Sequence, residues 1–279
     1  MSRAPSPSPE RFPGIPGLSL PSLWSAGAAF WQRAFASDFA WKVGETFATR
    51  VFLLAAGVAA GVLVARSLGP EGRGLYAVAM AFAGMSMQFG NLGLHTANAY
   101  FVARDRSLMP RLAGNSLAVS GVVGGLAVAG LWILATLRPE IAPLHGALLA
   151  LTCASIPLGL AYMLLQNLLI GVQDVRSFNR IEILVRLVSL SLIVLVIALA
   201  KVTPAAIFAA GLVASTAGLA GVLRRLGRLL PERPHPSPVL LRAHLVYGLK
   251  FYLACFFSYL VVRFDLLMVH SMLGTREAG

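Results

Sequence analysis

Three arginines lie inside long apolar stretches, where a charge is costly. Arg50, Arg186 and Arg263 each interrupt a run of residues that is otherwise almost wholly apolar. An arginine at the centre of a bilayer costs from about 2.5 to more than 10 kcal/mol, so such charges are candidates for function. A guanidinium is permanently charged and can bind an oxyanion through two parallel hydrogen bonds. The three arginines are therefore predicted to bind an anion, although Arg50 and Arg186 could instead extend to the membrane surface.

Two acidic residues accompany these arginines. Glu182 precedes Arg186 by four residues, a spacing at which the two can pair along one face of a helix, which is a further alternative for Arg186. Arg263 and Asp265 are two residues apart, so on a helix they point in directions roughly 200° apart. Each of these two therefore needs a partner elsewhere in the fold, which makes Asp265 a further candidate for function.

An uncharged polar stripe lies within the apolar stretch of residues 75–100. Gln88, Asn91, His95 and Asn98 are spaced by three, four and three residues, which places them on one face of a helix. Amide side chains both donate and accept hydrogen bonds, so this face could line a cavity for a ligand rich in hydroxyl groups. The alternative is hydrogen bonding between helices, worth about 0.6 kcal/mol per contact in membrane bundles. For Asn98, a position near the lipid headgroups would by itself account for a polar side chain.

The composition predicts the elements that position these residues. The 279-residue chain is 57% hydrophobic and only 12% charged, about half the charged fraction of a soluble domain. This excludes a soluble enzyme and predicts an all-α integral membrane protein. Seven stretches approach the roughly 20 residues that cross a bilayer as a helix. They cover residues 45–65, 75–100, 111–137, 144–170, 181–200, 204–223 and 247–272.

The distribution of lysine and arginine predicts the orientation. With the N-terminus in the cytoplasm, the cytoplasmic segments carry 15 of these residues and the opposite side carries 5. Short cytoplasmic loops of membrane proteins are enriched in Lys and Arg. We therefore expect a multi-pass protein of the inner (plasma) membrane with a cytoplasmic N-terminus. The basic residues of the loops are expected to meet anionic membrane lipids and not nucleic acid.

A weak internal repeat indicates the domain organisation. Residues 68–74 (LGPEGRG) and 273–279 (LGTREAG) share Leu-Gly and a final Gly at an offset of 205 residues, and such repeats are common in transporters. We expect a six-helix bundle over residues 45–223, a basic, Pro-rich cytoplasmic linker over 224–246 and the first helix of a truncated second bundle over 247–279. Residues 1–44 form a cytoplasmic tail, in which aromatic residues at helical spacing over 19–42 predict an interfacial amphipathic helix. Irregular contact with headgroups is the alternative.

Three segments carry a resemblance to a known family. Residues 65–77 (ARSLGPEGRGLYA), 91–101 (NLGLHTANAYF) and 247–265, which opens with YGLK and ends with RFD, are similar to motifs of the polysaccharide biosynthesis flippase family. This family lies within the multidrug/oligosaccharidyl-lipid/polysaccharide exporter superfamily. The resemblance covers about residues 41–279, roughly the N-terminal half of a typical member. It implies that the chain is a piece of a longer transporter or requires a second chain to complete the cavity.

The resemblance implies a function and roles for the polar residues. Family members translocate a polyprenyl-diphosphate-linked oligosaccharide for cell-surface polysaccharide biosynthesis, lipopolysaccharide included. Arg50, Arg186 and Arg263 would then engage the diphosphate, and Asp265 would be a proton or sodium coupling site. The polar stripe would contact the glycan.

Two other functions are compatible with the sequence. One is a multidrug or cation antiporter of the same superfamily, although such a site should favour intramembrane carboxylates over arginines. The other is an inactive half-transporter or membrane scaffold. No acidic pair, activated nucleophile or metal-ligand spacing is visible, so we expect no enzyme activity, no cofactor and no bound metal.

Overall fold

The computed structural model describes residues 38–200 and 202–253, with side chains from residue 43 onward. These residues form helices and no strand. The helices are α2 (Asp38–Gly90), α3 (Leu94–Arg104), the short 3-10 helix η1 (Arg106–Leu108), α4 (Met109–Leu137), α5 (Gly146–Gly171), α6 (Val175–Ala198) and α7 (Pro204–Leu229). A last helix covers residues 238–253. Most of the predicted interfacial helix and most of the predicted seventh span lie outside the described residues.

The chain divides into a first unit, residues 1–48, and a second unit from Thr49 onward. The described part of the first unit is the beginning of α2. All features below belong to the second unit.

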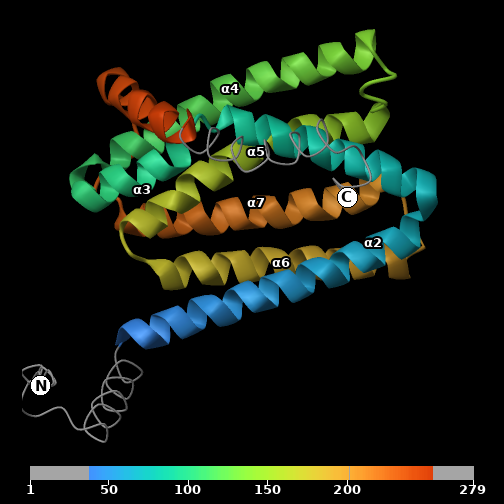
Figure 1. Cartoon of the computed structure of the whole chain (residues 1–279), viewed down its shortest axis with the longest axis horizontal. Helices are drawn as coiled ribbons and strands as arrows, with labels where there is room; N and C mark the ends of the chain where they lie inside the picture. Colours follow the sequence, from blue (N-terminus) through green and yellow to red (C-terminus); the bar gives the residue numbers. More distant parts are fainter. Residues whose placement is uncertain (1–37, 201, 254–279) are drawn as a thin grey trace, which may run out of the picture. The chain divides into compact units, whose positions relative to one another are not determined.

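Helix α2 is a helical hairpin. Gly69 has φ 67° and ψ 178°, a conformation that costs glycine little but a residue with a Cβ much more. Pro70 follows and is tolerated because the first turn of a helix leaves its amide hydrogens unpaired. The chain reverses at this point, and Tyr76 on the second half packs against the cluster that holds Ala60 and Val64 on the first (Figure 1). The predicted first span and the larger part of the predicted second span thus lie in the two halves of α2.

The predicted helix over residues 75–100 is interrupted, so the prediction of one continuous helix is wrong. Between α2 and α3, Leu92 and Gly93 have φ of 49° and 74°. Asn91 stabilises the break because its Oδ1 accepts a hydrogen bond from the Gly93 amide at 2.8 Å. An asparagine side chain that bonds the backbone two residues later is a common turn former.

The remaining helices alternate in direction across short connections (Figure 1). Residues 138–145 join α4 to α5, residues 172–174 join α5 to α6, and residues 199–203 join α6 to α7. Connections this short make successive helices antiparallel neighbours. In the described residues, five helices are long and apolar enough to cross a membrane. The first, Val43–Gly90, has 48 residues, enough for the two passes of the α2 hairpin.

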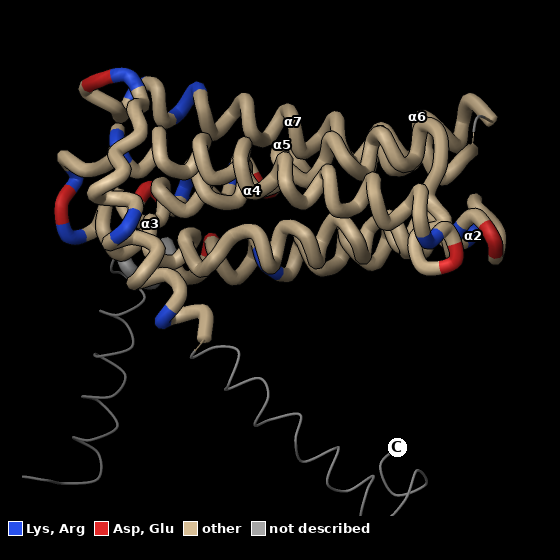
Figure 2. Tube along the Cα trace, turned by 90° about the horizontal axis from the view of Figure 1, so that it is seen from above, with Lys and Arg blue, Asp and Glu red and all other residues tan. Residues whose placement is uncertain are grey.

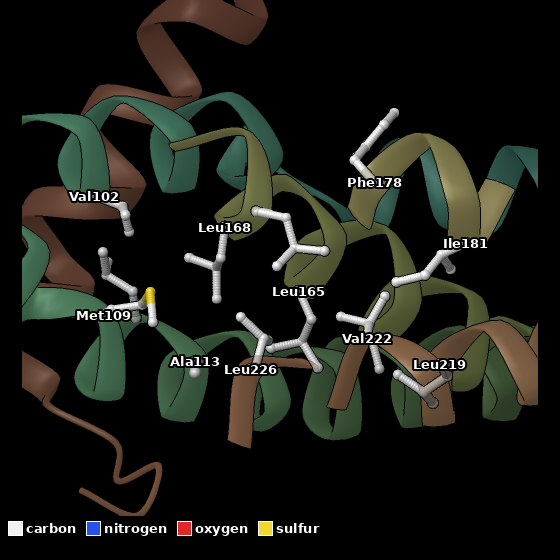
Figure 3. Close-up of a cluster of buried hydrophobic side chains, with 13 residues drawn as sticks. Val102, Met109, Ala113, Leu165, Leu168, Phe178, Ile181, Leu219, Val222 and Leu226 are labelled. Carbon is white, nitrogen blue, oxygen red and sulfur yellow. The ribbon is translucent and has the colours of Figure 1, made fainter. Parts of the chain in front are cut away.

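A close-packed core joins α3, α4, α5, α6 and α7 (Figure 3). Leu165 and Leu168 of α5 lie at its centre and are fully buried. The opposite surfaces are apolar as well: Val122, Leu126 and Trp132 of α4 are 65%, 69% and 58% exposed. Exposed apolar side chains on this scale are typical of a surface that faces lipid.

Charged residues gather at the helix ends (Figure 2). The end of α3, the start of α4, the start of α6 and the end of α7 carry most of the described arginines, Arg104, Arg106, Arg111, Arg176, Arg180, Arg224, Arg225 and Arg228. The middle of the bundle is nearly free of charge. This distribution makes the few charges inside it the natural place to look for a site.

Candidate functional site

A cavity of about 400 Å³ lies inside the bundle, between both halves of α2 and helices α5, α6 and α7. We call it the bundle cavity. Its wall is largely apolar, with Leu53, Met80, Met87 and Phe208 among the lining residues. The polar groups that line it are Tyr76, Ser155, Tyr162, Glu182, Arg186, Ser189 and Ser215. A few convergent polar groups in an apolar wall are the usual composition of a ligand site.

Arg186 is the charged residue of the bundle cavity for which the described part of the chain provides no counterion. Within the described residues its guanidinium makes no ion pair and no hydrogen bond. It packs against Gly57 of α2, where an added Cβ would lie 3.8 Å from Nη2. The Arg186 guanidinium thus lies close to the backbone of α2 at Gly57.

Glu182 pairs with a different arginine from the one that the sequence spacing allowed. Its Oε2 accepts a hydrogen bond from Nη1 of Arg50 at 3.0 Å. The Arg50 guanidinium also lies 5.8 Å from the centre of the Phe178 ring, a cation–π distance. The described residues show no Glu182–Arg186 pair, which the spacing had allowed as an alternative, because α2 brings Arg50 to the carboxylate across the helix interface.

The three charged groups thus leave one positive charge unbalanced. The Glu182 carboxylate pairs with Arg50 and not with Arg186, and the Glu182 side chain is only 22% exposed. A charge in a poorly hydrated site is strongly stabilised by an opposite charge that enters it. The site can therefore accept an anion beside Arg186, with the hydroxyl groups of Ser189, Tyr76 and Ser215 lining the same cavity.

The polar stripe lies elsewhere in the bundle. Asn98 is fully buried, and its Nδ2 donates to Ser116 Oγ at 2.9 Å and to the Leu164 carbonyl at 2.8 Å. Asn91 Nδ2 donates to the Gln88 carbonyl at 2.6 Å, and its Oδ1 lies 2.8 Å from His95 Nδ1. None of the four stripe residues lines the bundle cavity. The contacts of Asn98 are of the interhelical kind that the sequence left as the alternative.

Arg263 and Asp265 lie outside the described residues. Their assignment to the diphosphate and to ion coupling stays a prediction. In the described part of the chain, no group of three or more His, Cys, Asp or Glu side chains could hold a metal ion.

Several cavity residues are uncharged and were missed by reasoning from the sequence. Ser189 follows Arg186 by three residues, which continues the spacing of four from Glu182. The face formed by Glu182, Arg186 and Ser189 was therefore visible in the sequence as a short polar stripe. Ser155, Tyr162 and Ser215 gave no such signal, because single hydroxyl groups are common in membrane helices.

The comparisons with known proteins give one match. Residues 51–279 match the family model described as polysaccharide biosynthesis protein. No curated protein and no solved structure matches the chain.

Proposed function

The chain belongs to the polysaccharide biosynthesis protein family, and from this premise we propose that it is a flippase-type transporter. Its substrate is a polyprenyl-diphosphate-linked oligosaccharide, which it moves across the inner membrane without changing it chemically. The diphosphate is the part of such a molecule that opposes transfer, because two phosphate charges cannot enter hydrocarbon without compensation.

The observation that supports this proposal is the unpaired Arg186 in the bundle cavity. A guanidinium binds the oxygens of a phosphate through two hydrogen bonds. The hydroxyl groups of Tyr76 and Ser189 line the same cavity and can donate further hydrogen bonds to phosphate or sugar oxygens. The Arg50–Glu182 pair keeps a second guanidinium close to the same space.

The polyprenyl chain needs no site of its own in this proposal. Apolar side chains cover the outside of α4, with Leu126 and Ile133 69% and 51% exposed. A hydrocarbon tail can stay in the lipid alongside such a surface while the polar head crosses inside the protein. Arg263 contributes further positive charge and Asp265 couples transport to an ion gradient, as the resemblance implies.

The test uses cells that lack the native protein. These cells should accumulate lipid-linked oligosaccharide that is accessible only from the cytoplasmic side, and the native protein should remove this accumulation. Arg186→Gln should reduce transport by about tenfold or more, since a charged hydrogen bond contributes roughly 1.5–3 kcal/mol. Arg186→Lys should retain part of the activity because it keeps the charge and loses the paired hydrogen bonds.

The matched control is Arg180→Gln on the same helix. Arg180 is exposed and does not line the bundle cavity, so transport should be unchanged. The proposal fails if cells without the protein show no accumulation, or if Arg186→Gln and Arg180→Gln transport equally well at equal protein levels in the membrane.

A further inference from the structure

A second concave site lies at the end of the bundle where the arginines gather. It is an open cleft of about 530 Å³ between the last turns of α3 and the helix of residues 238–253. We call it the basic cleft and define it by Tyr100, Arg104, Arg242, Tyr247 and Lys250, which line it. The bundle cavity is lined by none of these residues, so the two sites are separate.

Two glycines place the helix of residues 238–253 against α3. A Cβ on Gly93 would collide with the carbonyl of Gly248, and a Cβ on Gly248 would lie 2.9 Å from the Leu92 carbonyl oxygen. The two backbones therefore cross in direct contact, which only glycine permits at both positions. This crossing determines which side chains of the two helices meet.

The crossing brings aromatic rings together on one wall of the cleft. Tyr100 and Tyr247 stack with their ring centres 4.5 Å apart and an angle of 11° between the planes. Phe101 meets Tyr247 edge to face at 5.7 Å. Tyrosine rings are enriched where a membrane protein passes through the headgroup region, because the ring is apolar and its hydroxyl group is polar.

Three positive charges line the cleft without a counterion. Within the described residues Arg104, Arg242 and Lys250 make no ion pair, and no acidic residue lines the cleft. The acidic neighbour Asp105 accepts a hydrogen bond from the Ser107 amide at 2.9 Å. Three like charges held at one cleft repel one another and favour an anion between them.

We propose that the basic cleft binds the phosphate of an anionic phospholipid headgroup. The cations come from α3 and from the helix of residues 238–253, so one bound headgroup bridges two elements that are far apart in the sequence. The tyrosine wall contacts the glycerol region of the lipid. The bound lipid holds the helix that follows the six-pass bundle against α3, and this role is independent of the transported substrate.

The experiment measures lipid retained by the full-length native protein. The protein is reconstituted in vesicles of phosphatidylglycerol and phosphatidylcholine, extracted in mild detergent and examined by native mass spectrometry. We expect one retained phosphatidylglycerol per chain. Arg242→Gln combined with Lys250→Gln should lower this retention by about tenfold, since each basic residue near a membrane surface adds to the attraction for anionic lipid.

The matched control combines Arg224→Gln with Arg228→Gln on α7. It removes the same charge at the same end of the bundle, and neither residue lines the basic cleft, so retention should stay within about twofold of native. Thermal unfolding of both double variants establishes that they are folded. A cleft variant that does not fold is replaced by Tyr100→Leu, which keeps the charges and removes the stacked ring, and retention should again fall.

Three results would overturn the proposal. The first is equal retention of phosphatidylglycerol by the cleft variant and the native protein. The second is an equal loss in the α7 control, which would indicate general attraction to a basic surface. The third is displacement of the lipid by millimolar inorganic phosphate or diphosphate, which would identify a soluble anion as the occupant.

Discussion

Single residues inside the bundle show how contacts between helices determine which charged groups form ion pairs. Glu182 and Arg186 are separated by one helical turn, yet the carboxylate bonds to Arg50 at 3.0 Å. An ion pair within one helix contributes only about 0.2–0.5 kcal/mol, so a better-placed cation from another helix easily replaces it. The arginine left over is the one that the proposed function requires.

The charge of Asp174 contributes to the stability of the fold through two interactions. Asp174 precedes α6, accepts a hydrogen bond from the Ser177 amide at 3.3 Å and pairs with Arg225 at 2.6 Å. Asp174→Ala removes both interactions, so the free energy of unfolding should fall by about 1–2 kcal/mol. Asp174→Asn keeps an oxygen at the helix start and should lose less than about 1 kcal/mol. Thermal unfolding in detergent, followed by tryptophan fluorescence, gives both values, and a larger loss for Asn than for Ala would contradict this assignment.

The same carboxylate predicts a dependence on pH. Burial raises the pKa of Asp174, but the hydrogen bonds from Arg225 and Ser177 outweigh it and hold the pKa below its ordinary value of 3.8. A carboxyl group with a lowered pKa in the folded state stabilises the fold above its ordinary pKa. This contribution is lost as the pH falls through the lowered pKa. The stability difference between native protein and Asp174→Asn should therefore be constant above about pH 5 and shrink below pH 4.

At the scale of helices, the glycines in contact differ from those in the sequence motif. Gly121 and Gly125 of α4 form a GxxxG pair, a motif that often marks close helix contact. Among the described residues, no atom beyond the adjacent residues and the nearby backbone of α4 lies within 4 Å of a Cβ added at either position. Their neighbour Gly124 makes the contact instead, because an added Cβ would lie 2.9 Å from Cα and Cβ of Pro157.

This difference between adjacent glycines can be tested by two substitutions. Gly124→Ala should lower the free energy of unfolding by about 1–3 kcal/mol, because the backbone and ring of Pro157 cannot move aside without shifting α5. Gly125→Ala is the control and should leave stability unchanged or raise it by up to about 1 kcal/mol, since alanine favours a helix more than glycine does. Thermal unfolding of the two variants in the same detergent measures the effect. Equal destabilisation by both would mean that α4 and α5 do not pack as described.

At the scale of the whole molecule, the arginines at one end predict the orientation in the membrane. Ser107, between α3 and α4, lies at the end with most arginines, and Glu140 lies between α4 and α5 at the other end. In a protein with Cys153→Ala and Cys255→Ala, Ser107→Cys should react with a membrane-impermeant maleimide only after the cells are permeabilised. Glu140→Cys should react in intact cells, because the side with fewer basic residues faces outward. The reverse pattern would invert the predicted topology.

The sequence alone was sufficient for the class of fold. An all-helical membrane protein follows from apolar stretches of about 20 residues, because each buried polar group of the backbone must be satisfied within its own segment. The hairpin in α2 was visible too, since the glycine and proline at positions 69 and 70 separate two such stretches. The motif at residues 65–77 indicated the family that the match over residues 51–279 shows.

Only the tertiary structure decided which of these residues act together. The partner of Glu182 and the separation of the polar stripe from the bundle cavity both depend on helices that are distant in the sequence. The basic cleft depends on the crossing of Gly93 and Gly248, which are 155 positions apart. Transfer free energies are properties of a local segment and can be read along the chain. Contacts between side chains depend on the rotation and depth of each helix, and these are determined by packing against its neighbours.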